Sequence, residues 1–159
     1  MSRRARGQSL AEFALIAPLF FMLLFGIIEG GRFIFYYETL SNATREGARY
    51  AIVNGERSLT CSTGPDDGTS STSCDPTGDD VVDKVRSSAI GMVGSEIDVD
   101  RCWWYSSCDF KSGLATYGDG NYLRGATVTV RATYTYSSIL PLPLPNITVE
   151  AESSLVINN

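Results

Sequence analysis

The sequence predicts an α+β protein in which one long N-terminal helix, first transmembrane and then amphipathic, packs on a small antiparallel β-sheet. Two observations carry this prediction. Residues 13–28 contain no charged side chain, and a helical pattern of apolar residues continues from there to residue 53. The last third of the chain instead alternates apolar and polar residues, as half-buried strands do. A length of 159 residues suits one small domain with an anchor.

The apolar run is long enough to cross a membrane. Residues 10–28 are interrupted only by Glu12, and a helix needs about 20 mainly apolar residues to span a ~30 Å hydrocarbon core. Three arginines lie among the first six residues, and the next basic residue is Arg32. This asymmetry predicts a cytoplasmic N-terminus and an extracytoplasmic remainder.

The helix is expected to continue outside the membrane over residues 29–54, where Asn54 and Gly55 provide a stop signal. Its apolar residues recur at three- and four-residue spacing. Among them Ala43, Gly47 and Ala51 form a series of small residues four apart, which permits close approach of another helix. Packing against the chain's own sheet explains the series equally well.

The outer domain is expected to cover residues 55–159. Residues 55–80 are rich in Ser, Thr, Asp, Gly and Pro and predict a long polar loop. A short helix is predicted over residues 80–92, capped by Asp79 or Asp80. Strands are predicted from residue 97 to the tryptophans, over residues 126–136 and over residues 147–157, with a turn at residues 119–120 and a proline-rich connection over residues 140–145.

All four cysteines follow the apolar run, which suits disulfides in an oxidising compartment. We predict the pairs Cys61–Cys74 and Cys102–Cys108 because each closes a short loop; free thiols or a crossed pairing are the alternatives. The adjacent aromatic residues are interpreted either as an exposed adhesive patch or as side chains buried against the sheet: Trp103, Trp104 and Tyr105.

Composition argues against several functions. The chain has no histidine, which excludes the common histidine-dependent catalytic and zinc sites. A net charge of -5 gives no reason to expect a nucleic-acid partner. The acids of the polar loop do not follow EF-hand spacing. We therefore expect no enzyme activity, no cofactor and no metal site.

The start of the apolar run carries a motif. Residues 7–13 read GQSLAEF, that is G-x-x-x-x-E-F behind a short basic leader. This resembles the processing site of type IV pilins, particularly the Flp or tight-adherence branch. The resemblance implies cleavage by a prepilin peptidase between Gly7 and Gln8, which makes residues 1–7 a leader peptide. It also implies that Glu12, followed by Phe13, sets subunit register by pairing with the new α-amino group of Gln8 on a neighbouring subunit.

The similarity extends to about residue 50 and includes the proline in the span and the REGAR segment of residues 45–49. Together these features resemble the TadE-like family of minor pilins or pseudopilins. The resemblance implies a pilin-like fold and a role in assembly of a tight-adherence pilus for surface attachment. The implied partners are the prepilin peptidase, other pilin subunits, the inner-membrane assembly platform and the lipid bilayer.

Other readings of the leader are weaker. A twin-arginine signal would need an apolar pair after the arginines, and residues 5–8 lack one. A cleaved secretory peptide would need small residues after Ile28, where Glu29 follows instead. The main alternative function is a single-pass anchored binding or sensing module that is never processed.

Overall fold

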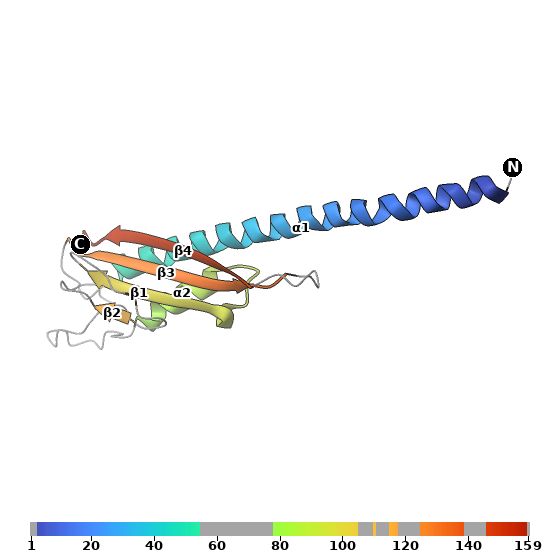
Figure 1. Cartoon of the computed structure of the whole chain (residues 1–159). Helices are drawn as coiled ribbons and strands as arrows, with labels where there is room; N and C mark the ends of the chain where they lie inside the picture. The colour runs from blue at the N-terminus through green and yellow to red at the C-terminus, as the bar shows by residue number, and fades with distance from the viewer. Residues whose placement is uncertain are drawn as a thin grey trace.

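The structure is a computed structural model that describes residues 3–54, 78–104, 110, 115–117, 125–138 and 146–158. One long helix carries a small domain at its C-terminal half, while its N-terminal half projects away from that domain (Figure 1). The predicted α+β arrangement is confirmed. In chain order the elements are α1 Arg3–Val53, α2 Asp79–Ser88, the 3₁₀ helix η1 Gly94–Glu96, β1 Ile97–Trp104, β2 Ala115–Tyr117, β3 Thr127–Tyr136 and β4 Ile147–Val156.

The strands form one sheet in the order β2-β1-β3-β4. β3 pairs antiparallel with both β1 and β4, which confirms the predicted antiparallel sheet for the three longer strands. β2 pairs parallel with β1 through Ala115, Thr116 and Tyr117, and the sequence did not predict it. Three residues are too few to display a two-residue alternation.

The core lies between α1, α2 and one face of this sheet. Residues of β3 at every second position are buried, because side chains alternate between the two faces of a strand; they are Val128, Val130, Ala132, Tyr134 and Tyr136. Leu40, Ala43, Ala48 and Ala51 of α1 are fully buried against this layer. The apolar positions of β3 and of α1 thus determine which face of the sheet packs against which side of the helix.

Helix α1 is longer than the sequence indicated at its start. It begins at Arg3, within the predicted leader, and runs without interruption through Pro18, a residue type that commonly kinks or opens a helix. The helix ends at Val53, and both the backbone nitrogen and the side-chain amide of Asn54 donate to the Tyr50 carbonyl, at 3.0 and 3.1 Å.

Helix α2 differs from its predicted bounds at both ends. Its N-cap is Gly78, not Asp79 or Asp80, which both lie in the first turn. Gly78 has φ +67° and lies so close to Trp103 that a Cβ would come within 2.9 Å of the indole, so glycine meets both the backbone and the space requirement. The helix ends at Ser88 with Ala89 as its C-cap, and Gly91, at φ +81°, lies in the turn that follows.

An ion pair joins the start of α2 to the sheet. The buried Arg101 of β1 donates from Nη2 to Asp79 Oδ1 at 2.9 Å and from Nη1 to the Val99 carbonyl at 3.2 Å. Burial of a guanidinium is tolerable when its hydrogen bonds are made. The contact fixes the end of α2 that follows the predicted polar loop. That loop itself, the turn at residues 119–120 and the connection over residues 140–145 lie outside the described residues.

Candidate functional site

The first turns of α1 contain the motif residues. Gln8, Glu12 and Phe13 are all exposed, and Gln8 Nε2 donates to Glu12 Oε1 at 3.2 Å, one helical turn apart. The bond between Gly7 and Gln8 lies within continuous helix. Glu12 therefore has a neutral local partner in the single chain, and no side chain of the outer domain reaches it among the described residues.

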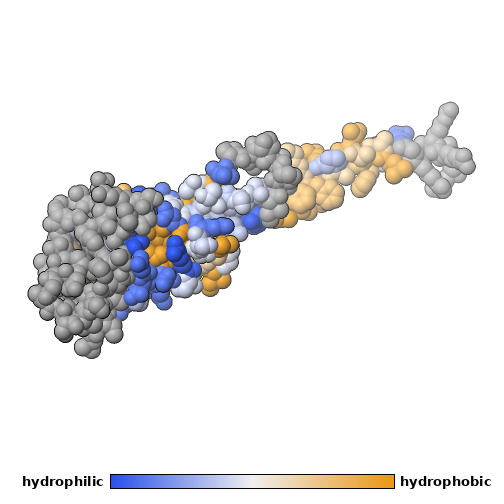
Figure 2. All heavy atoms as spheres, turned by 90° about the horizontal axis from the view of Figure 1, so that it is seen from below, coloured by the Kyte–Doolittle hydropathy of each residue, from blue (hydrophilic) through white to orange (hydrophobic). Residues whose placement is uncertain are grey.

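Over residues 13–28 helix α1 carries no charged side chain, and none of these residues is buried. It is the one helix in the described part of the chain that is long and apolar enough to cross a membrane, and none of its most apolar 18-residue window is buried in the protein. Figure 2 shows this apolar surface on the projecting half of the helix. Apolar area of this extent is unstable in water. The helix is consistent with single-pass membrane anchoring.

A cluster of charged and aromatic side chains lies where the free half of α1 meets the domain. Arg32 contacts Glu29 Oε2 at 3.3 Å, the Tyr36 hydroxyl at 3.4 Å and the Tyr136 hydroxyl at 3.5 Å. The Tyr136 hydroxyl in turn donates to the Glu29 backbone carbonyl at 3.4 Å. These bonds connect the last residue of β3 to the exit of the apolar span, and we call the four side chains the junction cluster.

Aromatic rings surround the same guanidinium. Its carbon lies 5.6 Å from the Tyr36 ring centre and 5.4 Å from that of Tyr136, within cation–π range. Tyr136 also packs edge-on against Phe33, at 5.8 Å and 90°. The sequence predicted a helix that contains Tyr36 and a strand that contains Tyr136. It did not predict that the two rings would meet, because strand order and register decide which residues come together.

Burial raises the pKa of Tyr136 to about 12; nearby Glu29 adds to the rise, and the positive charge of Arg32 opposes it. The phenol of Tyr136 thus stays protonated above the pH at which an ordinary tyrosine, with a pKa of about 10, ionises. The native protein then binds a proton that the unfolded chain has lost. Stability conferred by this group is complete below pH ~10 and is lost as the pH rises toward ~12.

A spectrophotometric titration tests the raised pKa of Tyr136. Tyr136→Phe is expected to reduce the phenolate absorbance that develops latest in the native protein, since it removes a buried hydroxyl with a pKa near 12. The unfolding free energy of the variant should also fall less steeply than that of the wild type between pH ~10 and ~12. Tyr37→Phe, which replaces an exposed tyrosine of α1, is the control. A late component that survives in Tyr136→Phe and shrinks in Tyr37→Phe would contradict the assignment.

The small-residue series of α1 packs within the chain. Ala43 and Ala51 are fully buried, and Gly47 faces α2 and the sheet: a Cβ on it would overlap Val85 Cγ2 and lie 3.7 Å from methyl groups of Val81 and Val130. Of the two interpretations open in the sequence, contact with the chain's own domain is therefore the one found.

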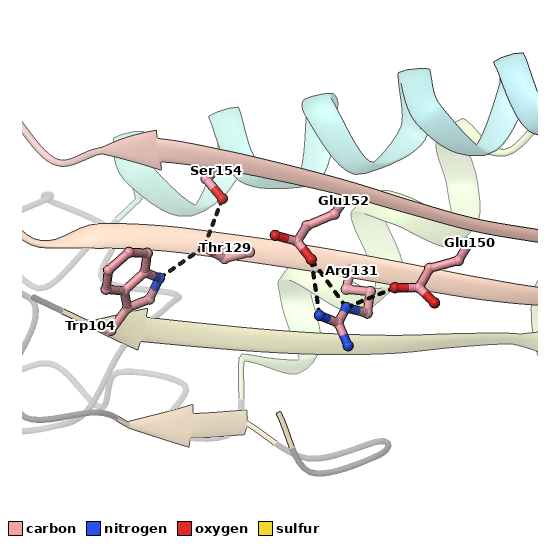
Figure 3. A network of polar contacts seen from close by, with 6 residues as sticks. All are labelled: Trp104, Thr129, Arg131, Glu150, Glu152 and Ser154. Atoms are coloured by element: carbon pink, nitrogen blue, oxygen red, sulfur yellow. Dashed lines mark hydrogen bonds and ion pairs between the residues drawn. The ribbon is translucent and has the colours of Figure 1, made fainter. Parts of the chain in front are cut away.

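The candidate adhesive patch is not supported at its first residue. Trp103 is buried in the core, where its ring lies against Gly78. Trp104 is half-buried on the opposite sheet face and donates from Nε1 to Thr129 Oγ1 at 2.9 Å, which also bonds Ser154 Oγ at 2.8 Å (Figure 3). Tyr105 lies outside the described residues. The tryptophans alternate across β1, so two neighbours cannot share one exposed face.

The same outer face carries an ion-pair group. Arg131 of β3 bonds Glu150 Oε1 at 3.2 Å and Glu152 Oε2 at 3.0 Å, both from β4 (Figure 3). Phe110 lies over its guanidinium at 4.0 Å. Partly exposed pairs of this kind contribute about 0–1 kcal/mol each. We regard the group as a solvated cross-strand network that supports the pairing of β3 with β4.

The cysteine pairing stays a prediction. Cys102 is fully buried in β1 and is not a free thiol, whereas Cys61, Cys74 and Cys108 lie outside the described residues. Within the described part of the chain no group of three or more potential metal-ligating side chains comes together.

A long apolar helix that carries a small α+β domain defines a helix-anchored α+β protein. The comparison with known families agrees: the model described as "TadE-like protein" matches residues 7–49. The chain thus carries a TadE-like segment, which confirms the resemblance and supports a protein associated with tight-adherence pili. The match covers most of α1 and none of the sheet. No curated protein and no solved structure matches the chain.

Proposed function

We propose that this protein is a minor pilin or pseudopilin that takes part in assembly of a Flp-type tight-adherence pilus used for surface attachment. The observation that carries the proposal is the coincidence of three features in one helix. The family match begins at Gly7, the residue before the expected cleavage. The apolar surface that follows is uncovered, and the only acid within residues 10–28 is Glu12. A subunit that assembles through its N-terminal helix needs all three.

Processing is the first step of the proposal. A prepilin peptidase cuts between Gly7 and Gln8 on the cytoplasmic face and removes Arg3, Arg4 and Arg6, so the formal side-chain charge changes from -5 to -8. The backbone is helical across this bond, and a protease needs it locally extended. Glycine assists here, because it costs a helix about 1 kcal/mol relative to alanine and leaves the backbone unobstructed.

Register selection is the second step. Cleavage creates a positive amine on Gln8, while in the single chain the Glu12 carboxylate accepts a hydrogen bond from the neutral amide of the Gln8 side chain at 3.2 Å. A carboxylate accepts a stronger hydrogen bond from a charged amine than from a neutral amide. In a bundle of like helices, a neighbouring subunit at the correct height supplies that amine. A subunit at the wrong height leaves a charge unpaired in a medium of low dielectric constant, which is costly.

The location and partners follow from these steps. The protein sits in the bacterial cytoplasmic membrane with its N-terminus inside and residues 55–159 outside, in contact with lipid, other pilin subunits and the inner-membrane assembly platform. It catalyses no reaction itself. Because the protein is cleaved before it leaves the membrane for assembly, the prepilin peptidase is its first partner.

Intact-mass measurement tests processing. The full chain produced together with a prepilin peptidase of a tight-adherence system is expected to lose residues 1–7 and begin at Gln8. Gly7→Leu should retain them, because a branched side chain obstructs the backbone at the bond to be cut. Gly26→Leu is the matched control: Gly26 lies in the same helix with nothing within 4 Å of its Cβ position, and its replacement should not affect cleavage. A wild-type chain that keeps its leader would favour the unprocessed anchored module.

A further inference from the structure

The end of the domain nearest the free half of α1 carries exposed apolar side chains. Ile90 is 77% exposed and Val93 54% exposed in the connection between α2 and β1. Figure 1 places this connection at the end of the sheet from which α1 projects. Ile34 and Phe35 of α1 are exposed as well. The two pairs of side chains lie close together, because a Cβ built on Gly91, next to Ile90, would lie 3.4 Å from the Phe35 ring. We call Ile34, Phe35, Ile90 and Val93 the apolar rim.

The rim continues the lipid-facing surface of the helix. Ile27 and Ile28 are exposed near the end of the apolar run, and the same helix exposes Ile34 and Phe35 about two turns later. Between them Glu29 and Arg32 bond each other and Tyr136, so their charges are partnered where the chain leaves the apolar run. The apolar surface therefore does not end at Ile28 but reaches the domain.

Helix geometry gives the rim its depth. Glu12 and Arg32 are 20 positions apart, which is about 30 Å at ~1.5 Å per residue and equals the thickness of the hydrocarbon core. With Glu12 at the inner boundary, Arg32 lies at the outer one, four positions beyond the end of the predicted span at residue 28. Phe35 then stands about 4.5 Å farther out, within a headgroup layer about 5–7 Å thick. Ile90 and Val93, beside Phe35, reach the same layer.

The chemistry at this level suits a bilayer surface. Tyrosine rings and arginine are side chains that anchor proteins at the boundary between lipid and water, and the partly exposed Tyr36 and Arg32 of the junction cluster lie at this level. We propose that the apolar rim binds the outer leaflet, so that the domain rests on phospholipid at Ile90 and Val93 as well as being tethered by α1. The occupant is the boundary between headgroups and acyl chains, and the contact is apolar.

This second attachment restricts how the domain stands. A domain held by one helix alone can tilt and rotate about the point where that helix leaves the membrane. Contact at the connection between α2 and β1, on one side of α1, restricts the tilt of the domain and sets the side toward which it leans. Each copy then stands at a similar tilt before assembly. The inference rests on the membrane anchoring in the proposed function.

Site-specific photo-crosslinking tests the inference in the full chain. Ile90 and Val93 are replaced one at a time by p-benzoylphenylalanine, and the protein is reconstituted in nanodiscs of phosphatidylethanolamine and phosphatidylglycerol. The matched controls are Val53 and Val156, which are 61% and 46% exposed at the end of the domain away from the free half of α1 (Figure 1). Leu19, within the apolar run, is the positive control for lipid contact. Lipid adducts are identified by intact mass.

We expect several-fold more lipid adduct at Ile90 and Val93 than at Val53 and Val156. Lipid adducts at Leu19 with only background at Ile90 and Val93 would overturn the inference and leave the anchoring intact. Cross-links from Ile90 and Val93 to a second copy in place of lipid would also overturn it. Absence of lipid adducts at Leu19 would remove the anchoring itself, and the inference with it.

Discussion

Glu12→Ala is expected to leave the protein inserted in the membrane and cleaved after Gly7, yet to reduce its incorporation into pilus-associated complexes more than tenfold. Glu12 is exposed in the first turns of α1 and contacts no side chain of the domain among the described residues, so its loss does not disturb the fold. Truncating one partner of a buried charge pair costs about 2–5 kcal/mol. Each 1.4 kcal/mol weakens association about tenfold.

Three further variants distinguish loss of the proposed register contact from loss of a side chain as such. Glu12→Gln keeps a hydrogen bond to Gln8 but removes the charge, and it should fail as Glu12→Ala does. Glu38→Gln, at an exposed acid farther along the same helix, should assemble normally. In a Gly7→Leu background, where no amine forms, Glu12→Ala should cause no further loss. Cross-linking between copies in the membrane measures all of them, and wild-type assembly of Glu12→Ala would refute the register role.

Gly47→Leu is expected to destabilise the outer domain strongly. Gly47 is buried beneath α2, and even a Cβ there overlaps Val85 Cγ2. Overpacking by a few methylenes costs about 1–3 kcal/mol and occasionally more, whereas a whole domain is stable by only about 5–15 kcal/mol. Gly47→Ala should be milder, since the overlap is partly offset by about 1 kcal/mol of improved helix propensity. Urea unfolding of the full chain in detergent micelles, followed by near-ultraviolet circular dichroism, measures both variants.

Two controls locate the cause at the contact between the helices. Gly31→Ala, in the same helix with nothing within 4 Å of its Cβ position, should leave the midpoint of domain unfolding unchanged. Val85→Ala removes the overlapping methyl group, so the double variant with Gly47→Ala should lose less stability than the sum of the single variants. A Gly47→Leu protein that is as stable as the wild type but fails to associate would instead place Gly47 at a contact between copies.

The sequence by itself determined the elements whose pattern is long. The uncharged run of residues 13–28 and the strict alternation of residues 126–136 each repeat one period several times, so helix and strand were distinguishable without tertiary information. The motif at Gly7 and Glu12 was equally readable, because its residues lie close together in one helix. The TadE-like match over residues 7–49 rests on the same local features.

Only the tertiary structure decided which of these elements meet. Parallel pairing of β2 depends on a neighbour in space, since three residues have no period of their own. The N-cap of α2 is Gly78 and not the predicted Asp79 or Asp80, and the Trp103 ring of β1 lies where a Cβ at residue 78 would stand. Arg32 meets Tyr136 across 104 positions of chain. Local propensity acts over a few residues, whereas packing depends on residues far apart in the chain. The periodic pattern of one segment therefore does not show which other segment it will contact.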